Sequence, residues 1–250
     1  MGFSQTEYDA VVAEIDSGMN DIKDKVRQVV PAAEAGVAHW YVPGVVAGVV
    51  LGLADEVVRI ATTLLDKLTE LLEGVAAPVL FFFDAYGWSD VKGQASDVAG
   101  ELDPTGMPSS RRWSGDAQQA YARIIPGQAA AALRIGAVAD STAVSLNVCA
   151  VAGLAFYVAL GAIVAQFVAA LVGVIAALGS VAFSWAGVAL AVGDTSISAG
   201  LIIAAVTALV GVLTAQAEQM VTMHGQVVDN SAFPGGKWPD PSTGSYEHAG

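Results

Sequence analysis

The sequence predicts an all-α protein, a bundle of long helices that includes one very apolar Ala/Gly/Val-rich region. Hydrophobic residues make up 54% of the chain but aromatic residues only 8%. Ala, Val, Leu and Gly therefore carry the apolar surface, and small side chains of this kind suit closely packed helices. Two runs without charged residues, 141–193 and 195–217, exceed the usual length of a strand.

The net charge of −13 limits the partners of the chain. An acidic surface repels phosphate backbones, so we expect no nucleic-acid binding. Anionic lipid headgroups are repelled as well, so any contact with a membrane has to rest on burial of apolar side chains. Cys149 stands alone in an apolar run and is expected to be a buried structural thiol.

The first helix is expected over residues 4–30. Ser4 and Glu7 form a capping-box pattern, and Phe3 and Tyr8 stand where a hydrophobic staple closes the helix start. Pro31 is expected to end the helix. Apolar residues recur every three or four positions and define one face: Tyr8, Val11, Val12, Ile15, Met19, Ile22, Val26 and Val29.

A second helix is expected from Pro43 to about residue 76. Gly44, Gly48 and Gly52 repeat every fourth residue within it, which places all three on one stripe of the helix. Such a stripe lets another helix approach closely, so we expect an interface between helices there.

The rest of the chain, after the second predicted helix, divides into segments of different composition. A short helix is expected over 90–102, followed by a stretch rich in Pro and Gly that forms the clearest internal boundary. A further helix follows Trp113, with a kink or break at Pro126-Gly127. We therefore predict four parts: amphipathic helices (1–103), a turn and helix (104–140), an apolar helical region facing a membrane or an oligomer (141–228), and a disordered tail (229–250).

The apolar region allows two interpretations. Both uncharged runs are long enough to cross a bilayer, and Asp194 between them reads as a helix N-cap. However, no Lys or Arg occurs between Arg134 and Lys237, so the basic loops that orient an ordinary multipass protein are missing. The alternative is that these helices pack against the rest of the chain and against copies or partners.

The most informative cluster begins at Trp113, Ser114 and Gly115. Physically it is a turn that opens a helix: Ser114 can cap, and Gly115 allows a tight backbone approach. Trp113 is expected over the junction of two antiparallel helices, with Tyr121 facing the same seam. The cluster resembles the Trp-X-Gly helical hairpin of the WXG family of type VII (ESX) secretion substrates. It is most similar to the longer secretion-associated proteins of mycobacteria and related actinobacteria.

The resemblance implies export by a route that does not use a Sec leader, ending at the cell surface, in the cell envelope or outside the cell. The family's export signal is Tyr-X-X-X-Asp/Glu, normally after the hairpin. Here it is matched by Tyr86 to Asp90, before Trp113. Many substrates of this class travel as pairs in which only one partner carries the signal. The resemblance therefore also implies a protein partner that carries or completes the signal, in a homo- or hetero-oligomer.

No pattern in the sequence indicates catalysis. His39, His224 and His248 lack the spacing of a zinc site, and neither a nucleophile elbow nor a phosphate-binding or dinucleotide-binding loop occurs. We therefore expect no enzyme, no metal and no cofactor.

The sequence thus favours a type VII secretion substrate or associated protein that acts at the cell envelope through helical assembly and membrane contact. One alternative is a resident multi-helix membrane protein or channel component. Another is a soluble helical scaffold.

Overall fold

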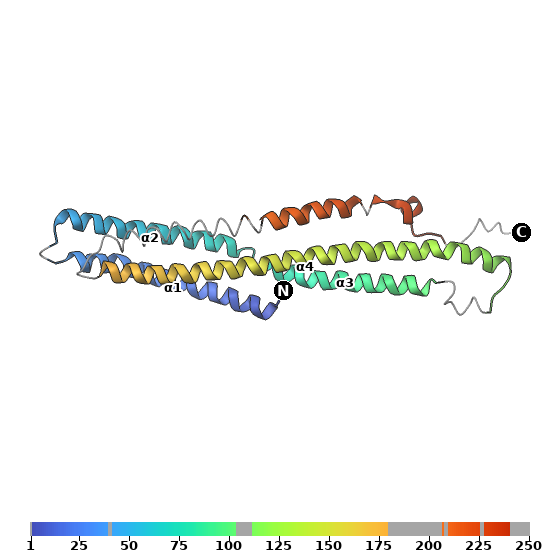
Figure 1. Cartoon of the computed structure of the whole chain (residues 1–250), viewed down its shortest axis with the longest axis horizontal. Coiled ribbons are helices and arrows are strands. Elements are labelled where there is room, and N and C mark those ends of the chain that lie inside the picture. The colour runs from blue at the N-terminus through green and yellow to red at the C-terminus, as the bar shows by residue number, and fades with distance from the viewer. Residues whose placement is uncertain are drawn as a thin grey trace, which may run out of the picture. The chain divides into compact units, whose positions relative to one another are not determined.

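A computed structural model of the chain describes residues 2–39, 42–103, 112–179, 207, 210–225 and 228–240. The described residues form four long helices and no strand, which confirms the all-α prediction (Figure 1). Residues 210–225 are also helical. The four long helices are α1 (Gln5–Val37), α2 (Gly44–Leu72), α3 (Ala77–Glu101) and α4 (Asp116–Leu178).

Packing divides the chain into two compact units. The first unit comprises Met1–Val79 and Val151–Val212, and the second comprises Leu80–Ala150 and Leu213–Gly250. Each unit thus contains one part of α4. This division follows packing rather than composition, and the four-part division made from the sequence stays a prediction.

The start of α1 follows its sequence signals. Ser4 is the N-cap, and its side-chain oxygen accepts a hydrogen bond of 3.3 Å from the backbone N–H of Glu7. The rings of Phe3 and Tyr8 lie 5.8 Å apart, as a hydrophobic staple requires. The predicted N-cap at Ser4 is confirmed, and the predicted apolar face supplies the buried side chains Tyr8, Ile15, Met19, Ile22 and Val29.

The prolines expected to break helices do not break them. The prediction that Pro31 ends the first helix was wrong, because α1 continues to Val37. Pro126 also lies inside α4, where a kink or break was expected. Proline removes one intrahelical hydrogen bond, but both prolines lie on the exposed side of a helix. Buried neighbours hold each helix in place: Val29 and Ala33 beside Pro31, and Ile125 and Gln128 beside Pro126.

The helix expected over 90–102 is longer than predicted. α2 ends at Leu72, and α3 begins at Ala77 and runs to Glu101. Pro78 therefore lies in the first turn of α3, where its missing N–H costs little. No further proline separates Pro78 from the predicted helix, and the aromatic run 81–83 is helical as well.

In the first unit, α1 packs along the second part of α4 (Figure 1). Gly161 of α4 faces Ile15, and a Cβ atom on Gly161 would lie 3.7 Å from the Ile15 side chain. Gly18 faces Val164 so closely that a Cβ atom on Gly18 would collide with the valine side chain. Near the other end of α1, Gly36 lies so close to α4 that a Cβ atom on it would collide with the Leu178 carbonyl oxygen. Along these contacts the residue numbers increase in the same direction on both helices, so α1 and α4 run parallel. The absence of side chains at the glycines allows the two helices to lie this close together.

Two tyrosines join these helices to the end of α2 and the turn that follows it. The Tyr8 hydroxyl donates to the Val75 carbonyl, and the Tyr157 hydroxyl donates to the Leu71 carbonyl at 3.0 Å. Their rings meet edge to face with centroids 5.4 Å apart. Burial raises the pKa of Tyr8, and the neighbouring Tyr157 raises it further, so the hydroxyl stays protonated as a donor.

Residues 229–240 were expected to be disordered, but the structure places two short 3-10 helices there, Asn230–Ala232 and Pro234–Gly236. The Asp229 carboxylate accepts a 3.0 Å hydrogen bond from the Ser231 backbone N–H. Gln128 of α4 donates to the Pro239 carbonyl at 2.9 Å. These contacts within the second unit order a segment whose composition alone suggested none; residues 241–250 lie outside the described residues.

We predict that Gly153→Ala lowers the free energy of unfolding by about 1–2 kcal/mol. A Cβ atom on Gly153 would lie 2.9 Å from Pro78 Cβ and closer still to Pro78 Cγ in that rigid ring. The matched control is Gly173→Ala on the same helix, where no described residue lies within 4 Å of the added Cβ. It should raise stability by about 0.5–1 kcal/mol through helix propensity. Urea unfolding measures both variants, and equal effects would contradict the close approach at Gly153.

Candidate functional site

In the second unit, α3 and the first part of α4 form an antiparallel pair, here called the α3–α4 hairpin. Lys92 of α3 forms a 2.8 Å ion pair with Asp140 of α4. One turn further along α3, Ala95 faces Gly136, and a Cβ atom on Gly136 would lie 3.5 Å from Ala95 Cβ. Numbers rise on one helix as they fall on the other, so the helices run in opposite directions, as a hairpin requires.

The Trp113 cluster lies in the connection of this hairpin, directly before α4. Gly115 has φ = 110°, a backbone conformation that residues with a side chain rarely adopt. Its carbonyl accepts a 3.1 Å hydrogen bond from the Gln119 N–H, and α4 begins at Asp116. Glycine is thus required by the backbone at this turn, and Asp116 places a carboxylate in the first helical turn, where the helix dipole favours it.

Trp113 and Tyr121 come together as expected. Their ring centroids lie 5.7 Å apart. The Trp113 side chain is nevertheless 40% exposed, so the ring covers the start of α4 without being enclosed. Ser114 is exposed. The residues of the predicted motif therefore form an accessible surface at the turn.

Tyr86 and Asp90 lie one turn apart on α3, away from the connection. Tyr86 is 60% exposed, and its ring meets that of Phe82 edge to face at 4.9 Å. Asp90 is exposed as well. A separation of four residues puts both on one side of the helix, so the pair is available to a partner.

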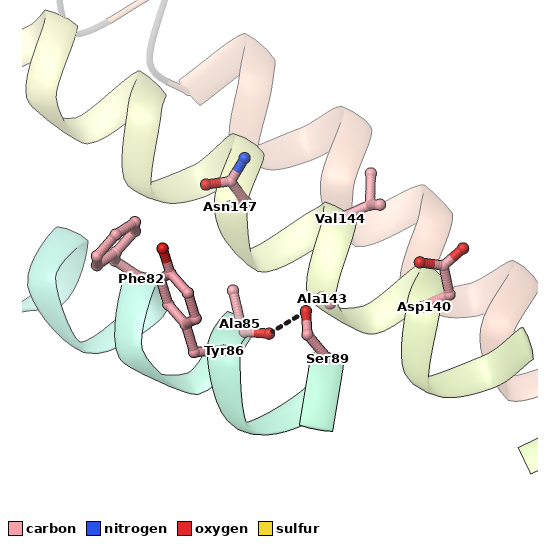
Figure 2. Close-up of a pocket in the computed structure, with 8 residues that line it drawn as sticks. All are labelled: Phe82, Ala85, Tyr86, Ser89, Asp140, Ala143, Val144 and Asn147. Carbon is pink, nitrogen blue, oxygen red and sulfur yellow. Dashed lines mark hydrogen bonds between the residues drawn. The ribbon is translucent and has the colours of Figure 1, made fainter. Parts of the chain in front are cut away.

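An open hollow of about 260 Å³ lies beside Tyr86 between the two helices of the hairpin (Figure 2). Figure 2 shows the Phe82 and Tyr86 rings next to each other on α3, with Asp140 and Asn147 across from them on α4. The polar groups are largely occupied, because Asp140 pairs with Lys92 and the Ser89 hydroxyl donates to the Ala85 carbonyl at 3.0 Å. The hollow has no pair of groups suited to acid–base or nucleophilic chemistry.

The glycine stripe of α2 contacts no other helix among the described residues. Gly44, Gly48 and Gly52 are exposed, and no described residue lies within 4 Å of a Cβ atom built on any of them. The adjacent Val45 is 83% exposed. The helix approach expected here is not made within the described part of the chain, and the stripe as an interface stays a prediction.

The chemistry of the described residues offers little else. Among them, no group of three or more His, Cys, Asp or Glu side chains is placed to hold a metal ion. Comparison of the chain with protein-family models, with curated proteins and with solved structures found no match. The function therefore has to be inferred from the sequence motif and from the geometry of the described residues.

The feature that the sequence did not reveal is an exposed apolar surface on α4. By length and composition, α4 qualifies as a candidate membrane span, yet only 33% of its most apolar stretch is buried. In the first unit, one side of α4, here called the outer face, is exposed throughout. It consists of Ala155, Val158, Ala162, Ala165, Gln166, Ala169, Val172, Gly173 and Ala176. The uncharged run in the sequence indicated that this helix is buried in part, but it did not indicate which side of the helix stays exposed.

We predict that Gly115→Ala lowers the free energy of unfolding by about 1–3 kcal/mol, because alanine is strained at a positive φ. Trp113→Ala should cost only about 1 kcal/mol, since the ring is partly exposed and a cost of about 3–5 kcal/mol applies to a buried ring. Ser114→Ala is the control and should change stability by less than about 0.5 kcal/mol. Chemical denaturation measures all three variants; a Trp113→Ala effect above that of Gly115→Ala would contradict this description of the turn.

Proposed function

We propose that this chain is a non-enzymatic type VII secretion substrate or secretion-associated protein that acts at the cell envelope through helical assembly and membrane contact. The observation that carries the secretion part is the position of Trp113-Ser114-Gly115. The cluster lies in the connection of an antiparallel hairpin, at a glycine with positive φ. This is the place where the WXG-family hairpin, which the sequence resembles, has its Trp-X-Gly motif.

The exposed pair Tyr86 and Asp90 supports the same proposal. Its spacing is that of the family's export signal, and both side chains are exposed on α3. Because the pair precedes Trp113 instead of following it, we propose that export also needs a protein partner that carries or completes the signal.

Membrane contact is supported by the outer face of α4. Water-exposed positions of a soluble helix bundle are ordinarily polar, whereas every residue of this face except Gln166 is Ala, Val or Gly. A continuous apolar surface of this kind marks a site of association with protein or lipid. The same surface favours the second candidate, a resident membrane protein.

The experiment that tests the proposal is fractionation of actinobacterial cells with and without an active type VII secretion ATPase. We expect the chain outside the cell or at its surface only when the ATPase works. Retention in the inner membrane of both strains would contradict export and favour the resident membrane protein.

A matched pair of variants tests the motif itself. We predict that Trp113→Ala lowers the exported fraction severalfold, whereas Trp238→Ala leaves it unchanged. The two tryptophans are 40% and 42% exposed and both lie in the second unit, so their removal is comparable in size and accessibility. Equal export of the two variants, at equal cellular levels, would show that the Trp113 turn is not read by the secretion system.

A further inference from the structure

The part of α4 in the first unit is apolar on every side. Its inner face, directed at α1 and α2, consists of Tyr157, Leu160, Val164, Phe167, Leu171 and Leu178, all at most 4% exposed. Apart from Gln166, its outer face carries only Ala, Val and Gly. Gln166 is the one exposed polar side chain from 151 to 178. A helix that is apolar all round belongs in a protein core or in a membrane, and this one has a core on one side only.

The dimensions of the outer face fit a bilayer. From Ala155 to Ala176 the helix rises about 32 Å, close to the hydrocarbon thickness of about 30 Å. A protein partner would require one apolar side of α4, whereas hydrocarbon requires all of them. The all-round apolar character therefore favours lipid over a second copy of the chain. The net charge of −13 directs the choice to membranes with neutral headgroups.

α1 prevents this stretch of α4 from entering a bilayer while the first unit stays folded. Ile15 of α1 contacts Gly161, in the middle of the apolar stretch, and its neighbours Glu14 and Asp16 are exposed. Asp21 follows Gly18, which faces Val164. Charged side chains are costly inside hydrocarbon. If α4 entered as it stands, the carboxylates of α1 would be carried to the same depth.

We propose that the inner face of α4 is a second, covered half of a lipid-binding surface, and that α1 has to leave it before α4 enters the hydrocarbon of a membrane. α1 thus acts as a removable cover whose own charged side faces water. This inference rests on the membrane contact of the proposed function and adds the condition under which deep contact occurs.

A disulfide between α1 and α4 tests the condition. A Cβ atom on Gly18 would lie 3.7 Å from Val164 Cβ, close to the separation of about 3.8 Å in disulfides. The double variant Gly18→Cys/Val164→Cys also removes the valine methyl groups that would otherwise collide. It is made in the full chain with Cys149→Ala, which leaves no third thiol. Gel mobility reports the cross-link, and circular dichroism checks that the helices are retained.

The probe is a vesicle of pure phosphatidylcholine, and the readout is the fraction of protein that resists carbonate extraction. We expect the reduced variant to insert and the oxidised variant to remain extractable. Adding reductant to the oxidised variant should restore insertion. Insertion of the oxidised variant to the reduced level would overturn the inference while leaving membrane contact intact.

The matched control is Ala95→Cys/Gly136→Cys, also with Cys149→Ala, which ties α3 to α4 within the second unit at a Cβ–Cβ separation of 3.5 Å. It should insert equally when oxidised and when reduced. A control that is blocked by oxidation would overturn the specific role of α1.

Failure of every reduced protein and of the unaltered chain to associate with vesicles would instead contradict the membrane part of the proposed function. Dimers of the reduced Gly18→Cys/Val164→Cys chain that form without vesicles and do not insert would assign the surface to a second copy.

Discussion

The close contact of α1 with α4 is the constraint on which the first unit depends. α4 brings no polar face of its own to this unit, so its large apolar side chains are kept from water by amphipathic helices that do have one. Gly18 and Gly36 allow this contact, because any side chain there would meet α4 directly. The hydrogen bonds of Tyr8 and Tyr157 to carbonyls near the end of α2 then fix the third helix of the unit. The glycines thus set the distance between α1 and α4, and the two tyrosine hydroxyl groups fix where the end of α2 lies along them.

The sequence predicted those parts of the fold that depend on neighbouring residues. The cap at Ser4 and the apolar face of α1 follow from spacing over one or two turns, and both were confirmed. Helix ends at prolines were predicted less well. Whether Pro31 or Pro126 breaks a helix depends on how firmly the residues beside it are buried, and that burial comes from segments distant in the sequence.

The candidate site shows the same division between local and distant information. The contact of Trp113 with Tyr121 and the need for glycine at 115 could be inferred from the motif, because both concern one turn at a helix start. The exposure of the Trp113 ring could not, since it depends on what the α3–α4 hairpin leaves uncovered. The outer face of α4 was hidden for a related reason. A run of Ala and Val reads alike whether it faces a core or water, and only packing distinguishes the sides.

The proposed membrane contact depends most on one property of the folded chain: the outer face of α4 is open to water while its inner face is covered. Single cysteines on the two faces test it directly, in a chain that also carries Cys149→Ala. In buffer, Ala162→Cys should react with a water-soluble maleimide about as fast as in the unfolded chain, and Val164→Cys should be strongly protected. Protection of both positions in a monomeric sample would show that another segment already covers the outer face, and would contradict the account.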